Sequence, residues 1–185
     1  MYSQFVAITN RHLCSGDFLS QIERLSKLGL KAIILREKDL SETEYKKLAE
    51  QVLTICQNHG TTCILHSQIE IARSLDCDKI HLPLPMLVKQ QHILQGFQQI
   101  GTSCHSVADA LLAQQLGATY ITASHIFQTD CKPDLAPRGL AFLRAVCHAV
   151  SIPVYALGGI TFENATQTLE YGAAAACMMS GFMRL

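Results

Sequence analysis

Short runs of apolar residues alternate along the chain with longer segments in which apolar residues recur every three or four positions. The short runs are almost continuously apolar, as is typical of strands buried on both faces of a parallel sheet. The longer segments have the period of amphipathic helices, and several are followed by glycine. Eight strands are predicted, at residues 2–9, 31–36, 61–65, 78–82, 99–103, 119–124, 153–157 and 173–179.

Helices are predicted between these strands, and two of them have clear start signals. Ser41 followed by Glu44 forms a capping box, and Ser106 with Asp109 behind it starts a later helix. The predicted helical segments are residues 18–28, 41–59, 67–75, 88–95, 106–116, 140–150 and 162–171.

Eight strands separated by helical connectors predict a compact (β/α)8 TIM barrel, formed as a single domain by residues 1–185. The chain stops six residues after the eighth strand, so the last helix is expected to be short or missing. Either the chain is truncated, or an apolar patch is left that a second copy could cover, which makes a homodimer plausible. An open doubly wound sheet is the competing architecture, but no early Gly-x-Gly-x-x-Gly motif supports it.

Charge and cysteine content narrow the functional classes. Fifteen Lys and Arg balance fifteen Asp and Glu, and no basic stripe is present, so neither nucleic acid nor an anionic membrane is an expected partner. The eight cysteines form no C-x-x-C pair and no zinc-like grouping, so we expect reduced thiols, no metal ligation and a cytoplasmic protein. The chain has neither a signal peptide nor 18 uninterrupted apolar residues.

Catalytic groups of such barrels collect at the carboxyl ends of the strands. The sixth strand ends at His125, and a long polar loop with Thr129 and Lys132 follows. His125 is therefore a candidate for a group that titrates near neutral pH in a pocket mouth, although a turn histidine explains its position equally well. Ser103 ends the fifth strand, while His66 and His81 are interpreted as structural groups.

Two further strand ends suggest anion binding. Arg36 and Lys38 lie two positions apart after the second strand, where they could grip an anion together, or form a surface salt-bridge face with Glu37 and Asp39. Strands seven and eight end in glycine-containing segments, which let backbone amides approach a phosphate closely. These candidate phosphate-binding residues are Gly158, Gly159, Met179, Ser180 and Gly181.

Three separated segments resemble the thiamine phosphate synthase superfamily, in order and over nearly the whole chain. They are ILREKDLSETEY, IGTSCHSVADALLAQQLGATYITASHIFQTDCKP with RGL, and IPVYALGGI with YGAAAACMMSG. The resemblance implies a (β/α)8 barrel that binds a small thiazole phosphate or thiamine phosphate. In this superfamily the synthase condenses a thiazole phosphate with a pyrimidine diphosphate, using magnesium, and the TenI-type tautomerase aromatises a thiazole phosphate carboxylate.

The departures from the synthase pattern favour the tautomerase. The synthase has an Asn-Asp pair after the third strand and an acidic residue after the fourth, whereas this chain has His66-Ser67 and then Pro83 to Met86. Without these carboxylates a magnesium site is not expected, and no cofactor is expected unless the chain is a synthase. The loop HIFQTDCK looks like the tautomerase version, with His125 as the catalytic acid and base.

The resemblance also implies roles for the other candidates: Ser103 and Thr129 would line the thiazole pocket, and Arg36 or Lys132 would bind the carboxylate. Two alternatives remain open. One is an active thiamine phosphate synthase, because Arg36, Lys38, Thr129 and Lys132 match its pattern. The other is a ligand-binding regulator without catalytic activity.

Overall fold

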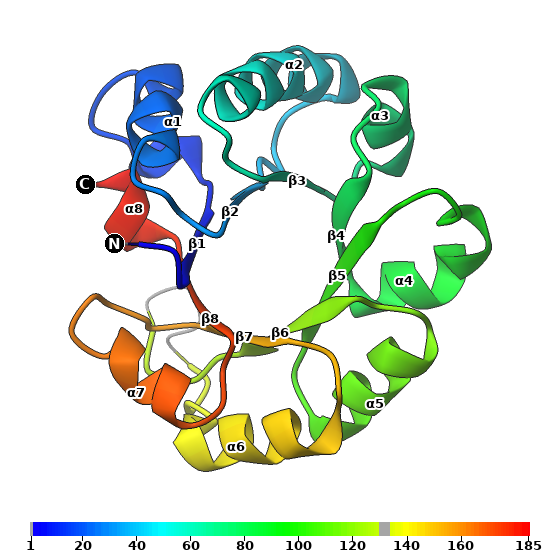
Figure 1. The fold of residues 1–185 in the computed structure, drawn as a ribbon, viewed down its shortest axis with the longest axis vertical. Helices are drawn as coiled ribbons and strands as arrows, with labels where there is room; N and C mark the ends of the chain where they lie inside the picture. Colours follow the sequence, from blue (N-terminus) through cyan, green and yellow to red (C-terminus); the bar gives the residue numbers. More distant parts are fainter. Residues whose placement is uncertain (1, 130–133) are drawn as a thin grey trace.

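A ring of parallel strands forms the centre of the fold, with the helices around it (Figure 1). The structure, a computed structural model, describes residues 2–129 and 134–185. Within these residues, eight strands close into a barrel in which each strand pairs with the next along the chain and β8 pairs with β1. The predicted (β/α)8 barrel is confirmed, and the open sheet is excluded.

The strands lie within one or two residues of most of the predicted boundaries, and six of the eight are shorter than the apolar runs that predict them. They are β1 (Phe5–Ile8), β2 (Ala32–Leu35), β3 (Cys63–His66), β4 (Lys79–Pro83), β5 (Gln99–Cys104), β6 (Tyr120–Ser124), β7 (Val154–Leu157) and β8 (Ala175–Met178). The helices between and after them are α1 (Phe18–Ser26), α2 (Glu42–Asn58), α3 (Ile69–Ser74), α4 (Leu84–Gln90), α5 (Val107–Gln115), α6 (Gly139–Ala149), α7 (Ala165–Glu170) and α8 (Ser180–Met183). Short 3-10 turns follow β1 (Arg11–Leu13) and α4 (Gln91–Ile93).

Local sequence signals explain most helix boundaries. Both hydrogen bonds of the Ser41–Glu44 capping box are present at the start of α2. The Ser106 hydroxyl accepts a hydrogen bond from the Asp109 amide at the start of α5. Gly29, which follows α1, has a φ of 71°, the left-handed conformation that glycine adopts without a Cβ penalty.

Two predicted helices have wrong boundaries. Helix α4 starts at Leu84, before the predicted position, because Pro83 and Pro85 occupy its N-cap and first turn, where a missing N–H costs no helical hydrogen bond. Helix α7 starts at Ala165, later than predicted. Thr161 and Asn164 bond each other's backbone amides through their side chains, which makes a turn before the helix.

The final helix is short, as the sequence predicts. Phe182 of α8 is fully buried and lies against Phe5 and Phe162, with ring centroids 5.8 and 5.5 Å apart. The Gln21 side-chain amide donates a 2.6 Å hydrogen bond to the Phe182 carbonyl, which joins α8 to α1. Figure 1 shows α8 beside α1, with both termini nearby. In the part of the chain that the structure describes, no helix is long and apolar enough to cross a membrane.

The apolar core has two layers. The larger lies between the barrel and its helices, and a smaller cluster fills the barrel interior. Inside, the Tyr120 and Tyr155 rings stack with centroids 4.7 Å apart. Gly101 of β5 makes room for them, because a Cβ at this position would lie 2.0 Å from Cζ of Tyr120. The interior cluster consists of Val6, Ile8, Ala32, Ile34, Ile64, Tyr120, Tyr155, Ala175 and Cys177.

Replacing Gly101 with alanine should destabilise the barrel by about 1–3 kcal/mol, because the added methyl group overlaps the buried Tyr120 ring. Urea unfolding of Gly101→Ala and the wild-type protein measures the difference. Gly16→Ala is the matched control, since no atom lies within 4 Å of the added Cβ. Equal stability of Gly101→Ala and Gly16→Ala would show that the Tyr120 ring does not need this space.

Candidate functional site

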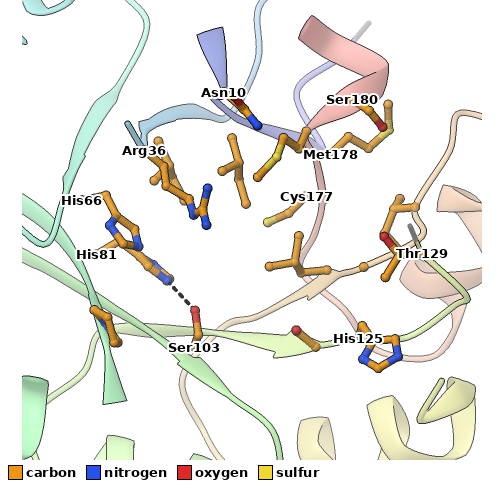
Figure 2. A pocket seen from close by; sticks show the side chains of 18 of the residues that line it. Asn10, Arg36, His66, His81, Ser103, His125, Thr129, Cys177, Met178 and Ser180 are labelled. Atoms are coloured by element: carbon orange, nitrogen blue, oxygen red, sulfur yellow. Dashed lines mark hydrogen bonds between the residues drawn. The ribbon is translucent and has the colours of Figure 1, made fainter. Parts of the chain in front are cut away.

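A cavity of about 630 Å³ opens at the carboxyl ends of the strands. Figure 2 shows its lining, with Arg36, His66, His81 and Ser103 on one side and Thr129 and Ser180 on the other. The polar residues and glycines that line it are Asn10, Arg36, Lys38, His66, His81, Ser103, His105, Ser124, His125, Thr129, Gly158, Gly159 and Ser180.

Most of the residues predicted from the sequence meet at this cavity, although they come from five strand ends. The cavity lining includes Arg36, Lys38, Ser103, His125, Thr129, Gly158, Gly159, Met179 and Ser180. Gly181 lies beside this lining, and a Cβ there would lie 2.5 Å from Cε of Met178. Lys132 lies outside the residues that the structure describes.

A buried carboxylate fixes the segment that carries the two cations. Glu37 is 4% exposed and accepts a 2.6 Å hydrogen bond from the Thr9 hydroxyl. The Arg11 backbone amide and guanidinium also donate to Glu37, each at 3.1 Å. Thr9 in turn accepts a 2.9 Å hydrogen bond from the Arg36 amide. Glu37 therefore ties the end of β2 to the loop after β1.

This arrangement separates the negative charge of Glu37 from the positive charges of Arg36 and Lys38. Arg11 and His12 also hydrogen-bond Asp39, and the Arg11 guanidinium holds the pKa of that carboxyl well below its usual range. Both local carboxylates are thus paired with groups from the β1 loop. Within residues 2–129 and 134–185, no ion pair joins a carboxylate to Arg36 or Lys38, so the structure does not have the salt-bridge face considered from the sequence.

Two histidines form the floor of the cavity beside these cations. The His66 and His81 rings stack with centroids 5.8 Å apart and an interplanar angle of 24°. Burial and the nearby charges of Arg36 and Lys38 lower the pKa of His66 to about 4. Burial and His66 lower the pKa of His81 to about 3. Both imidazoles are therefore neutral at physiological pH.

A hydrogen-bond chain runs from the barrel interior to Ser103. The Tyr120 hydroxyl lies 2.9 Å from Nδ1 of His81, and Nε2 of His81 lies 3.0 Å from Oγ of Ser103 (Figure 2). Burial raises the pKa of Tyr120 well above its usual value, so this phenol keeps its proton. We assign Tyr120 as the donor in this pair, because Nδ1 is the acceptor available to its buried proton among the described residues. The neutral imidazole then carries its proton on Nε2 and donates it to Ser103.

The hydrogen bonds from His81 and Thr122 determine whether Ser103 acts as a donor or an acceptor toward the cavity. The Thr122 hydroxyl also donates to Oγ of Ser103, at 3.2 Å. Oγ therefore accepts two hydrogen bonds, and its own proton is left for an acceptor in the cavity. With a pKa of about 3, His81 is a poor base, so the geometry makes Ser103 a hydrogen-bond donor, not an activated nucleophile.

His125 is 4% exposed, and its ring is held by the loop that follows it. Nε2 donates a 3.1 Å hydrogen bond to the Leu135 carbonyl. The Cβ of His125 packs against Gly158, where an added Cβ would lie only 2.2 Å away. In Figure 2 the ring lies at the edge of the cavity, apart from Arg36 and His81. This hydrogen bond gives His125 a role in positioning the loop.

The two glycines after β7 are needed for the same loop. Phe127 donates a backbone hydrogen bond to the Gly158 carbonyl at 2.9 Å. A Cβ on Gly159 would lie 2.3 Å from the Gln128 carbonyl oxygen. Gly158 and Gly159 have φ values of 99° and 64°, which glycine adopts readily. The glycine pair therefore lets the loop after β6 pack directly on the end of β7.

The magnesium ion that the resemblance implies does not fit these residues. Magnesium binds through carboxylate and other oxygen ligands, but no Asp or Glu is among the described residues that line the cavity. Where acidic residues would be expected, β3 ends in His66 and is followed by Ser67, and β4 ends in Pro83 and is followed by Leu84, Pro85 and Met86. Among the described residues there is also no group of three or more His, Cys, Asp and Glu that could hold a metal ion.

Three contributors to the site were not recognised from the sequence. His66 and His81 were treated as structural, yet both line the cavity. Their positions on the inward face at the ends of β3 and β4 were the available signal, because alternate strand residues face the barrel interior. Glu37 was grouped with the surface charges, and only the three-dimensional structure shows its contacts with Thr9 and Arg11.

The two buried histidines should make stability dependent on pH. As the pH falls below about 6.5, the unfolded chain binds protons at His66 and His81, whereas the folded chain binds them only near their lowered pKa values. The free energy of unfolding should therefore decrease as the pH is lowered, by about 1.4 kcal/mol per pH unit for each histidine. Urea unfolding between pH 5 and 7 measures this slope, which His66→Asn should reduce. Exposed His92→Gln is the control, and an unchanged slope in His66→Asn would contradict the assignment.

Removing the His125 ring should destabilise the loop after β6. His125→Ala loses the donor to the Leu135 carbonyl and should lower the free energy of unfolding by about 1–3 kcal/mol. His125→Gln places an amide N–H near the position of Nε2 and should lose less. Urea unfolding of both variants makes the comparison, and wild-type stability of His125→Ala would refute the positioning role.

Comparison with known proteins gives a consistent result. A family profile described as thiamine monophosphate synthase matches residues 5–182. A protein of Aquifex aeolicus named "Putative thiamine-phosphate synthase 2" is 36% identical over 181 residues, which are 96% of this chain and 96% of that protein. A thiamine-phosphate synthase of Fusobacterium nucleatum is 32% identical over 180 residues, which are 95% of this chain and 87% of that protein.

A solved structure agrees with these relatives. The thiamine phosphate pyrophosphorylase of Pyrococcus furiosus superposes with a TM-score of 0.85 at 26% identity, covering 98% of this chain and 87% of that one. Because these relatives are named as synthases, the tautomerase predicted from the sequence is wrong, and so is the isomerase class. Missing carboxylates and a histidine after β6 were insufficient evidence for it. The chain belongs to the thiamine monophosphate synthase family.

Proposed function

We propose that this protein is a transferase of the thiamine-phosphate synthase kind, which joins a thiazole phosphate to a pyrimidine diphosphate and releases diphosphate. The relatives that match nearly the whole chain carry this name. A cavity of about 630 Å³ is within the usual range for binding small molecules. The observation that carries the proposal is the pair Arg36 and Lys38, two cations at one cavity without carboxylate partners among the described residues.

The diphosphate end of the cavity is assigned to these two cations. The guanidinium of Arg36 can bind phosphate oxygens through two parallel hydrogen bonds, and the ammonium of Lys38 adds a compact charge. Partial burial, followed by the charge of Arg36, lowers the pKa of Lys38, which indicates that the two cations repel each other. A bound anion relieves this repulsion.

The thiazole phosphate is assigned to the opposite side, where the loops after β6, β7 and β8 meet (Figure 2). Thr129 and Ser180 offer hydroxyl groups there, and Gly158 and Gly159 allow close approach to the backbone. Met179 lines the same side, and Gly181 follows Ser180. In TIM barrels, phosphates are frequently bound by the loops after the last two strands. Lys132 is proposed to contribute a further cation, by its position in the sequence.

Ser103 lies between these two ends and is assigned to orient a substrate ring. Its free proton, directed by His81 and Thr122, can be donated to a ring nitrogen or another acceptor. A donor held in one direction restricts how the substrate lies, which favours a reactive geometry.

The proposed reaction forms one bond and breaks one. A carbon–nitrogen bond forms between the pyrimidine methylene carbon and the thiazole nitrogen, while the bond from that carbon to the diphosphate oxygen breaks. The electron pair of the broken bond leaves with the diphosphate, so negative charge accumulates on its oxygens. Arg36 and Lys38 stabilise that charge as it develops, which lowers the barrier. No step is assigned to a metal ion held by this chain.

The direct test is to incubate the purified full chain with thiazole phosphate and pyrimidine diphosphate. Thiamine phosphate and diphosphate should form in equal amounts. Arg36→Met should lower kcat/KM by about 100-fold or more, and Ser103→Ala by about tenfold, because each removes a contact to substrate. Lys47→Met, which removes an exposed lysine on α2, is the control and should retain wild-type kinetics.

Two results would contradict this function. Binding of both substrates without product would instead support the ligand-binding role considered from the sequence. Turnover that is unaffected by Arg36→Met would remove the assigned diphosphate end, even if the condensation itself were observed.

A further inference from the structure

The cavity rim formed by the ends of β2, β3 and β4 is cationic, and no Asp or Glu among the described residues lines it. Arg36 and Lys38 come from β2, His66 from β3, and His81 and Pro83 from β4. The carboxylates closest in sequence, Glu37 and Asp39, are bound by Arg11. This rim has the groups that bind an anion directly, and it lacks those that bind magnesium.

Starting from the proposed function, we infer that this rim binds the diphosphate directly on the side chains of Arg36 and Lys38, with no divalent cation ligated by the protein. The ligand is therefore the free diphosphate anion or the diphosphate group of the substrate. The proposal concerns how this chain holds the leaving group, and it does not depend on the rate of turnover.

Charge balance supports this arrangement. A magnesium ion held by two carboxylates contributes a net charge of zero to a site. If neutral groups replace both the magnesium ion and the two carboxylates, the net charge of the diphosphate site does not change. The positions where the family pattern has acidic residues carry neutral groups in this chain, Ser67 after β3 and the segment from Pro83 to Met86 at the end of β4. The two positive charges of Arg36 and Lys38 remain to attract the anion.

The rim is also held in place before the anion arrives. Glu37 is buried and accepts hydrogen bonds from Thr9 and Arg11, while Thr9 accepts one from the Arg36 backbone amide. The His66 ring is stacked on His81 and lies 2.8 Å from the Ser67 hydroxyl. Little backbone ordering is then required when an anion binds, which lowers the entropic cost of binding.

Isothermal titration of the full chain with inorganic diphosphate tests the inference. One titration contains EDTA, and the other contains magnesium at the same ionic strength, with the concentration of free diphosphate calculated in each. Binding should persist in EDTA, with a Kd within about threefold of the value in magnesium. In EDTA, Arg36→Met and Lys38→Met should each raise the Kd by about tenfold or more, the loss typical of a charge-assisted hydrogen bond. Lys47→Met should leave the Kd unchanged.

The outcomes separate this inference from the proposed function. Diphosphate binding in EDTA that depends on Arg36, without condensation of the two substrates, would support the inference and refute the synthase activity. Condensation of the two substrates, with diphosphate binding only in magnesium, would support the synthase activity and refute the inference. Absence of diphosphate binding in both titrations, or equal binding by Arg36→Met and wild type, would overturn the inference.

Discussion

The buried carboxylate of Glu37 is the contact on which the site depends. Residues 36, 37 and 38 follow β2 directly, and the side chain of Glu37 is bound by the loop after β1. Because Glu37 is held by Thr9 and Arg11, Arg36 and Lys38 are turned toward the cavity on the other side. A single anchored residue thus gives a mixed-charge sequence a cavity surface with two cations, and no Asp or Glu among the described residues lines that cavity.

The remainder of the cavity is arranged by neutral polar groups. Tyr120 fills the barrel interior against Gly101 and donates to His81, and His81 donates to Ser103. The barrel core and the hydrogen-bonding groups of the cavity are therefore one continuous structure. On the opposite side, His125 and the two glycines after β7 position the loop that carries Thr129. Packing and hydrogen bonding within the protein explain why His125 and the two glycines occupy these positions, without reference to a ligand.

The fold could be predicted from the sequence because the signals are local and repeated. Eight apolar runs, glycine after helices and the Ser41 capping box all have a direct physical meaning. The boundary errors occurred where local chemistry is ambiguous. Pro83 and Pro85 stop a strand and also suit the first turn of a helix, and only the packing of α4 decides between these roles.

The candidate site could be predicted less completely. Strand-end position identified Arg36, Lys38 and Ser103, which line one cavity. It could not distinguish a histidine that faces the cavity from one that bonds a loop carbonyl, so His125 was given the chemistry while His66 and His81 were interpreted as structural groups. Which partner each side chain meets depends on contacts between residues far apart in the chain, such as Thr9 with Glu37. The local pattern of apolar and polar residues does not contain information about such long-range contacts.

The position of bound diphosphate and the groups that hold it are the central test of this site. A crystal structure of the protein grown with inorganic diphosphate and EDTA is the most direct measurement. We expect phosphate oxygens within hydrogen-bonding distance of the Arg36 guanidinium and the Lys38 ammonium. Diphosphate bound elsewhere, or a divalent cation retained by side chains at the ends of β3 and β4, would contradict the account.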